Sequence, residues 1–227
     1  MSGNSDSPSP SLNEQYQRRF QASAVYRDGV WKQIVRLRLQ SRIGADKTVL
    51  DLGCGWGEFS RNIQAGRKLA MDLNGDAAGH LPADVEFLHQ DCSQPWPLGN
   101  DCIDVIFSSN FIEHLPDKHA LERTLVEARR CLKPDGRIIF MGPNIRYVGG
   151  AYWDYWDHHI ALTDKSLSEL LSLSGFEVSH CVDRFLPYSM SEGSNPPLML
   201  VALYLRLPIF WPLLGKQFLV EARPVDK

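Results

Sequence analysis

A strand that runs directly into a glycine-rich turn is the feature that most restricts how this chain can fold. Residues 49–57 read Val-Leu-Asp-Leu-Gly-Cys-Gly-Trp-Gly, and a helical pattern follows them. Glycines allow the backbone to turn sharply and allow a ligand to approach it closely. The pattern is typical of the first strand of an open α/β sheet, in which ligands bind at the carboxyl ends of the strands.

The loop does not match two common phosphate-binding patterns. A dinucleotide-binding loop needs a glycine three residues after Gly55, where this chain has Glu58, and a carboxylate at a helix N-terminus repels a pyrophosphate. The G-x-x-x-x-G-K-[ST] pattern of a P-loop is absent. Asp51, beside the loop, instead favours a ligand that carries a positive charge. A dehydrogenase is therefore the weakest functional hypothesis.

Two further acids follow apolar runs. Asp72 ends the next run, 21 residues after Asp51, which is the spacing of a ribose-binding acid in nucleoside-binding α/β folds. Asp91 ends the third run and is placed to accept a hydrogen bond from an adenine amine. Three acids without a phosphate cradle fit an adenosine that lacks phosphates and carries a cationic tail, as in S-adenosylmethionine.

Strand and helix patterns alternate along the chain, which predicts a mostly parallel α/β sheet with helices on both faces. Thr163 is expected to cap one helix and Gly175 to end it. Residues 133–136, Lys-Pro-Asp-Gly, are expected to form a turn. The predicted strands are 48–52, 68–71, 85–88, 103–107, 137–141, 176–182 and 217–222, and the predicted helices are 29–42, 59–63, 120–132 and 163–174.

These motifs, in this order, resemble the class I, Rossmann-like S-adenosylmethionine-dependent methyltransferases, in particular their type 11 branch. The matching features are the glycine loop, the acid at position 72, the Gln90-Asp91 pair, and Leu-Lys-Pro-Asp-Gly-Arg at 132–137. The resemblance covers residues 25–142 well and the remainder more loosely. It implies a seven-stranded, mostly parallel sheet with an antiparallel last strand, methyl transfer as the activity, and S-adenosyl-L-methionine as the cofactor.

The resemblance also implies roles for individual residues. The glycine loop is expected to bind the methionine part, Asp72 the ribose, and the residues after the third strand the adenine. Residues after the fourth strand are expected to line the methionine end of the pocket. The expected cofactor-binding residues are Asp51, Gly53, Cys54, Gly55, Asp72, Leu73, Asp91, Cys92, Asn110 and Phe111.

Two segments supply candidates for a general base, which a hydroxyl acceptor needs. His114 follows the fourth strand, and His158 and His159 lie further along the chain. We expect His159 to be the first choice among the three, because many relatives carry a histidine just before this helix cap. A metal ion held by Asp157 with His158 and His159 is a weaker alternative, since adjacent residues point in different directions. We therefore expect no metal.

The acceptor is expected to contact the aromatic and acidic residues of 152–159, because aromatic faces beside carboxylates commonly hold a sugar ring. A buried aromatic cluster is the competing interpretation. This segment, with residues 203–218, also resembles bacterial methyltransferases associated with surface-glycan synthesis, although less specifically. The expected substrate-binding residues are Tyr152, Trp153, Tyr155, Trp156 and Asp157.

The remainder of the chain predicts the organisation around this domain. Residues 1–15 are expected to form a disordered tail, and residues 16–227 a single domain with an insertion at 186–215. Within the insertion, the apolar run 198–214 is too interrupted by prolines and arginine to span a membrane. Three interpretations of this run are left: a lid over the active site, a homodimer surface, or a peripheral membrane patch.

Charge and cysteine content limit the partners and the compartment. The 227 residues carry a net charge of −3, which argues against nucleic acid as a partner. The five cysteines form no C-x-x-C pair, which argues against a disulfide framework. We therefore expect a cytoplasmic protein, with contact at the inner face of the membrane as an extension.

The leading functional hypothesis is O-methyl transfer to a small or glycan-like acceptor. A quinone, lipid or natural-product acceptor is the first alternative. The alternative from another class is a non-catalytic module that binds the cofactor and docks to a partner. DNA base methylation is not expected, because the N-x-P-x-aromatic run is absent after the fourth strand.

Overall fold

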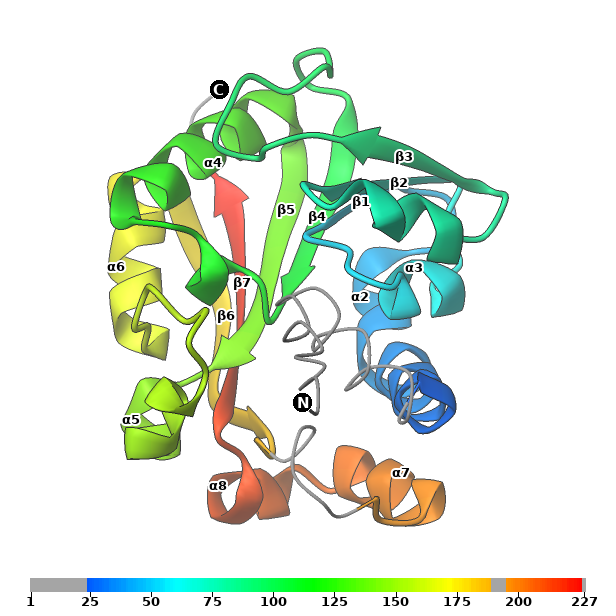
Figure 1. Ribbon diagram of the computed structural model, residues 1–227, viewed down its shortest axis with the longest axis vertical. Coiled ribbons are helices and arrows are strands. Elements are labelled where there is room, and N and C mark those ends of the chain that lie inside the picture. Colours follow the sequence, from blue (N-terminus) through cyan, green and yellow to red (C-terminus); the bar gives the residue numbers. More distant parts are fainter. Residues whose placement is uncertain (1–23, 189–194, 226–227) are drawn as a thin grey trace, which may run out of the picture.

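A computed structural model describes residues 24–188 and 195–225. Its centre is a seven-stranded sheet with the order β3-β2-β1-β4-β5-β7-β6 (Figure 1). The first five strands are parallel, and β7 runs antiparallel to both β5 and β6. The strands are β1 (Thr48–Leu52), β2 (Arg67–Asp72), β3 (Val85–His89), β4 (Ile103–Ser109), β5 (Leu132–Pro143), β6 (Phe176–Leu186) and β7 (Gln217–Pro224).

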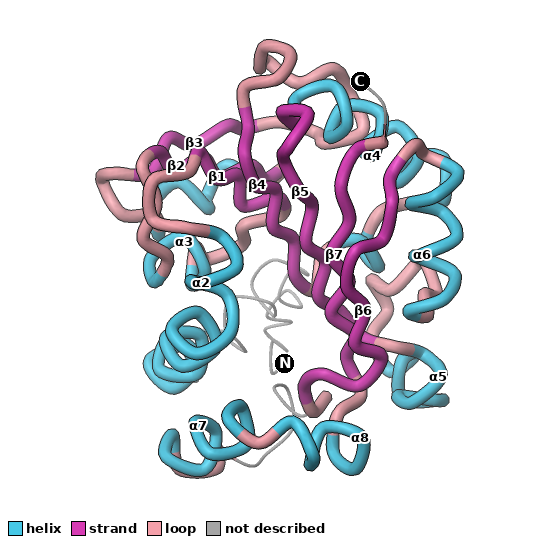
Figure 2. Tube along the Cα trace, turned by 180° about the vertical axis from the view of Figure 1, so that it is seen from behind, coloured by secondary structure: helices cyan, strands magenta, loops and turns pink. Residues whose placement is uncertain are grey.

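Helices cover both faces of the sheet, so the expected fold class is confirmed. Figure 2 shows α4 and α6 on one side and α2 and α3 on the other. Residues 24–34 are helical and continue into a π-helical turn, η1. The other elements are α2 (Gln40–Ile43), α3 (Glu58–Asn62), α4 (Lys118–Cys131), α5 (Ile145–Val148), α6 (Asp164–Leu173), α7 (Leu198–Arg206) and α8 (Trp211–Leu214), with the short helices η1 (Val35–Leu39), η2 (Gly75–His80), η3 (Ile112–His114), η4 (Gly149–Asp154) and η5 (Pro208–Phe210).

The core is divided between the two faces by the alternation of side chains along the strands. Val49 packs with Trp31 and Ile34 of the N-terminal helix. Its neighbour Leu50 packs on the opposite face, in the same cluster as Leu125 of α4. Burial on both faces explains why the central strands β1 and β4 are mostly apolar.

Several local predictions are confirmed. Thr163 caps α6 through a capping box with Ser166, and Gly175 follows the helix with a φ of +79°. Residues 133–136 differ from the prediction, because they lie inside β5 as a bulge. Ile103 pairs with Leu132 and Val105 with Arg137, so the intervening residues are extra on one strand.

Predictions for 1–15 lie outside the described residues, as does part of the 186–215 insertion, 189–194. Most of the rest of that insertion forms α7, η5 and α8, which lie together at one end of the molecule (Figure 1). No helix within 24–188 and 195–225 combines the length and the apolar character needed to cross a membrane.

Candidate active site

The carboxyl ends of β1, β2 and β4 meet at a cavity of about 250 Å³. In a parallel sheet these ends lie along one edge, where the loops leave room for a ligand. The cavity is therefore at the place predicted from the glycine loop. Its wall consists of Gly53, Gly55, Trp56, Asp72, Asn74, Asp76, Ala77, His80, Asn110, Phe111, His114 and Asp157.

The glycine loop adopts a backbone that side chains disfavour. Gly53, Gly55 and Gly57 have φ values of +72°, +51° and +73°. A Cβ atom at Gly53 would lie 2.1 Å from the ring of Phe111, whereas one at Gly55 would meet no atom within 4 Å. Gly53 is therefore needed for close packing, and Gly55 leaves open space at the cavity wall.

Asp72 connects the end of β2 to the glycine loop. One carboxylate oxygen accepts a hydrogen bond from the Gly55 backbone N–H at 2.9 Å, and the other accepts one from the Asn74 N–H at 2.9 Å. Each carboxylate oxygen keeps a second lone pair for a ligand hydroxyl. Asp72 thus has a fixed orientation at the cavity wall.

Asp51 is buried beneath the loop and does not itself line the cavity. Ser60 donates a hydrogen bond to its carboxylate at 2.7 Å. Burial raises the pKa of Asp51 to about 7, and the hydrogen bond from Ser60 only partly opposes this effect. Glu58, which the sequence places at the start of α3, forms an ion pair with Arg27.

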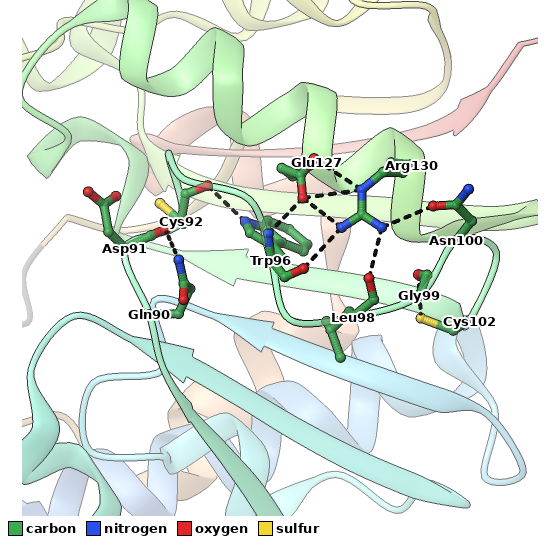
Figure 3. A network of polar contacts seen from close by, with 10 residues as sticks. All are labelled: Gln90, Asp91, Cys92, Trp96, Leu98, Gly99, Asn100, Cys102, Glu127 and Arg130. Atoms are coloured by element: carbon green, nitrogen blue, oxygen red, sulfur yellow. Dashed lines mark hydrogen bonds and ion pairs between the residues drawn. The ribbon is translucent and has the colours of Figure 1, made fainter.

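The loop after β3 is held by a polar network centred on Arg130 and Glu127 of α4 (Figure 3). Arg130 donates to the backbone carbonyls of Leu98 and Trp96, and Glu127 accepts from the Trp96 N–H. The network fixes the path of the loop that carries the predicted adenine contacts.

The predicted adenine contacts themselves lie at the start of this loop. The Asp91 carboxylate accepts hydrogen bonds from the Ser93 N–H and hydroxyl, both at 2.8 Å, and points away from Arg130 in Figure 3. Cys92 and Cys54 are buried, and burial raises the pKa of both thiols. Leu73 is 68% exposed. Of the described residues that line the cavity, none is Leu73, Asp91 or Cys92.

The end of β4 brings two predicted residues to the cavity. Asn110 has a φ of +48°, an uncommon value for a residue other than glycine, and its N–H donates to the Met141 carbonyl at 2.9 Å. This turn directs Phe111 onto the glycine loop and leads into η3, which ends at His114.

His114 and Asp157 form an ion pair at the cavity wall. His114 Nδ1 lies 3.3 Å from an Asp157 carboxylate oxygen and donates to the Asp157 backbone carbonyl at 3.0 Å. Burial acts to lower the pKa of His114, but the hydrogen bond to Asp157 and the charges of Glu113 and Asp157 outweigh it and raise the pKa. The interaction of the His114 ring with the Asp157 carboxylate lowers the pKa of Asp157 to about 2.

The other two predicted catalytic histidines lie differently. His158 is buried behind His114, with its Nδ1 2.8 Å from the Tyr152 carbonyl, and burial lowers its pKa. His159 is exposed, and its backbone N–H donates to the Glu113 carbonyl at 2.9 Å. Of the three histidines, His114 alone is among the described cavity-lining residues.

The predicted substrate-binding aromatics separate into two groups. Tyr152 is fully buried, and its hydroxyl donates to the Ile160 carbonyl. Tyr155 is half-buried with its ring 5.2 Å from that of His158. Trp153 and Trp156 are exposed. Tyr152 therefore packs in the interior and holds the segment 152–160 in place, while the two tryptophans remain accessible to a ligand.

Five further residues of the cavity wall were missed from the sequence: Trp56, Asn74, Asp76, Ala77 and His80. The rings of Trp56 and His80 stack with centroids 4.5 Å apart. Asn74 and Asp76 follow Asp72 in the turn before and within η2, where the Asn74 side chain accepts from the Asp76 N–H. Trp56 stands within the glycine motif, and the other four follow the predicted ribose acid Asp72 within eight residues. Their closeness to the predicted motifs was the signal that could have identified them.

Comparison with known proteins identifies the family. Residues 23–180 match the family model Methyltransf_23, described as a methyltransferase domain. A malonyl-[acyl-carrier protein] O-methyltransferase of Pectobacterium atrosepticum is 30% identical over 162 residues, which are 66% of this chain and 52% of that protein. A phosphoethanolamine N-methyltransferase of wheat is 29% identical over 104 residues, 41% of this chain and 21% of that protein. The chain thus spans about half or less of the length of these relatives.

Solved structures share the fold at lower identity. An S-adenosylmethionine-dependent methyltransferase from Archaeoglobus fulgidus has a TM-score of 0.67 and 19% identity, over 90% of this chain and 98% of that one. A methyltransferase solved in complex with the Trm112 activator from Haloferax volcanii also has a TM-score of 0.67, with 17% identity, over 92% of this chain and 95% of that one. Together with the match over 23–180, these findings show that the chain belongs to the class I S-adenosylmethionine-dependent methyltransferases.

Proposed function

We propose that the cavity holds S-adenosylmethionine with its methionine part against the glycine loop and its ribose at Asp72. The open space beside Gly55 allows a ligand to approach the backbone, and the oriented Asp72 carboxylate suits two vicinal hydroxyls. The buried acid Asp51 adds negative charge near the cationic end of the cofactor when it is ionised, above its pKa of about 7. Leu73, Asp91 and Cys92 follow β2 and β3 on the adenine side of this arrangement.

We further propose that the reaction is methyl transfer to an oxygen of a small or glycan-like acceptor. When bound, the cofactor supplies a methyl group that is already activated, so the protein chiefly orients the acceptor and manages its proton. The observation that carries this proposal is the His114–Asp157 pair on the wall of the same cavity. Asp157 holds the imidazole, whose Nε2 accepts the proton of a hydroxyl acceptor.

The exposed tryptophans support a glycan-like acceptor. Trp153 and Trp156 stand close in sequence to Asp154 and to Asp157 at the cavity wall. Aromatic faces beside carboxylates bind the apolar face and the hydroxyls of a sugar ring. The names of the relatives include both an O-methyltransferase and an N-methyltransferase, and neither name mentions a sugar. A quinone, lipid or natural-product acceptor is therefore kept as the alternative to a glycan.

The apolar surface on α7, η5 and α8 supports a peripheral membrane contact, and hence a lipid-linked acceptor. Met199, Ile209 and Leu213 are each at least 70% exposed, and Arg206 is exposed at the end of α7. Apolar side chains beside a cationic one favour an anionic lipid surface. The alternative is that the same surface forms a homodimer. The oligomeric state in solution distinguishes the two possibilities.

The proposed activity is tested by calorimetry followed by a product assay. The purified protein is titrated with S-adenosylmethionine and, separately, with NADH, and S-adenosylhomocysteine is then measured with nucleotide sugars, lipid-linked sugars, malonyl-acyl carrier protein and quinols. We expect micromolar binding of S-adenosylmethionine alone and turnover with a sugar acceptor. Turnover only with another acceptor would refute the glycan assignment, and binding without turnover with every acceptor would favour the interaction module.

A further inference from the structure

Three side chains with metal-ligating atoms meet behind the wall of the cavity. Glu113 and His114 lie in η3, and His158 lies in the segment that precedes α6. One ligand atom from each lies within 4.8 Å of the other two. Glu113 is 2% exposed and His158 is 8% exposed, whereas the His114 side chain is 32% exposed, so the cluster is shielded from water except at His114.

The hydrogen bonds of the two histidines determine which ring nitrogen carries the proton. His114 Nδ1 lies 3.0 Å from the Asp157 carbonyl, and His158 Nδ1 lies 2.8 Å from the Tyr152 carbonyl. A carbonyl oxygen only accepts, so each Nδ1 must carry the proton. In the neutral imidazole each Nε2 then presents a lone pair. Histidine ligands of metals are commonly oriented by such a hydrogen bond from the other ring nitrogen.

Glu113 contributes the negative charge. Its backbone carbonyl accepts from the N–H groups of His159 and Ile160 at 2.9 and 3.1 Å, which joins η3 to the histidine segment. In the part of the chain that the structure describes, its buried Oε2 atom has no hydrogen-bond partner. A buried carboxylate is strongly unfavourable unless a donor or a cation compensates it.

We propose that Glu113, His114 and His158 bind a divalent transition-metal cation. Two imidazoles and one carboxylate suit Zn²⁺, Mn²⁺, Fe²⁺ or Co²⁺, and three protein ligands leave positions open for water or a substrate oxygen. His114 also lines the cofactor cavity, so the cluster adjoins the cavity at this residue. This site was not expected from the sequence, in which Asp157, His158 and His159 were the metal candidates.

The metal site deepens the proposed function and rests on it for its catalytic meaning. A cation lowers the pKa of a hydroxyl that coordinates it, and the released proton passes to water. With His114 Nε2 as a ligand, the cation takes over from the imidazole in making the acceptor oxygen nucleophilic.

Metal binding can be measured without any acceptor. Tag-free protein is treated with a chelator, dialysed, and titrated with Zn²⁺ by calorimetry and with Co²⁺ by visible absorption. We expect one ion per chain for the wild type. Glu113→Gln and His158→Gln should each weaken binding at least about tenfold. His119→Ala is the matched control, because His119 is an exposed histidine that also pairs with a glutamate, Glu122.

Binding of S-adenosylmethionine by each variant serves as the test of folding. Stoichiometric Zn²⁺ and Co²⁺ binding that both cluster variants weaken would support the site. No stoichiometric binding by the wild type, or binding by folded variants within twofold of the wild type, would overturn it. Methyl transfer that persists without metal would leave the proposed function intact and remove only the cation's catalytic role. Metal binding without methyl transfer to any acceptor would confirm the metal site and refute the proposed function.

Discussion

The Asp72 carboxylate accepts a hydrogen bond from the Gly55 backbone N–H at 2.9 Å, which ties the end of β2 to the glycine loop of β1. The second carboxylate oxygen is held by the Asn74 N–H at the same distance. Both oxygens are therefore oriented by backbone donors before a ligand arrives. Such preorganisation lowers the entropic cost of binding.

Asp72→Ala should weaken S-adenosylmethionine binding at least tenfold, which corresponds to about 1.4 kcal/mol or more. The substitution removes both the proposed ribose contact and the tie to the loop. Asp76→Ala is the control, since it removes a carboxylate from the same cavity wall and should cost much less. Calorimetric titration measures both. An affinity for Asp72→Ala within twofold of the wild type would refute the ribose assignment.

Gly53→Ala should destabilise the protein and disrupt the cavity. The backbone has a φ of +72°, and the new Cβ would lie 2.1 Å from the Phe111 ring. Strain of this kind costs about 1–3 kcal/mol, to be measured by chemical denaturation. Gly79→Ala is the control, because no atom lies within 4 Å of a Cβ there. Adding Phe111→Ala should recover part of the loss by removing the clash but not the backbone strain.

The buried Asp51 should make stability fall as pH rises from about 4 to 7. Its pKa is about 7 in the folded protein against an ordinary value of 3.8, so the folded state binds the extra proton in this interval. The stabilisation, up to about 4 kcal/mol, is complete below pH 4 and lost above pH 7. Asp51→Asn keeps an oxygen for Ser60 and should flatten this dependence. Denaturation of both proteins at pH 5 and pH 8 provides the test, and equal slopes would contradict the prediction.

The fold could be predicted because strand and helix signals agreed with the tertiary arrangement. The glycine loop, the acids after β2 and β3, and the Thr163 cap are each recognisable from residue types within a short stretch of sequence, as with Thr163 and Ser166 in the capping box. The bulge at 133–136 was missed for the opposite reason. It is held by the Lys133 ammonium, which lies 2.9 Å from the Asp104 carboxylate of β4, a contact between distant parts of the chain.

The site was only partly predictable for the same reason. His159 was the first choice because it precedes the helix cap in sequence, but its side chain is exposed. His158 is the buried one, and its Nδ1 donates to the carbonyl of the buried Tyr152. The role of Glu113 depends on a segment 45 residues further along the chain, at His158. Spacing along the sequence does not indicate that Glu113 and His158 lie close together in the fold.

His114→Ala should lower kcat by about 10²–10⁴-fold while leaving S-adenosylmethionine affinity nearly unchanged. His114 lines the cavity, and Asp157 orients its ring. His159→Ala should lower kcat less than about threefold, because that side chain is exposed. The measurement is S-adenosylhomocysteine formation with the acceptor identified in the panel. If His159→Ala lowered kcat more than His114→Ala, His159 would be the general base instead. Full turnover by both variants would show that neither histidine acts as the base.

The apolar surface on α7, η5 and α8 should bind vesicles that contain phosphatidylglycerol. Each exposed apolar side chain that enters the lipid contributes roughly 1–2 kcal/mol, so Met199→Asp, Ile209→Asp and Leu213→Asp together should weaken co-sedimentation more than tenfold.

Leu173→Asp on α6 is a control for introducing an exposed charge, since Leu173 is 81% exposed but α6 lies away from α7 and α8 (Figure 1). Light scattering without vesicles measures the oligomeric state and so tests the alternative, a homodimer. A dimeric wild type that the triple variant converts to monomers, with no vesicle binding by either, would assign the surface to a second copy of the chain. Vesicle binding that the triple variant retains in full would exclude this surface as the membrane contact.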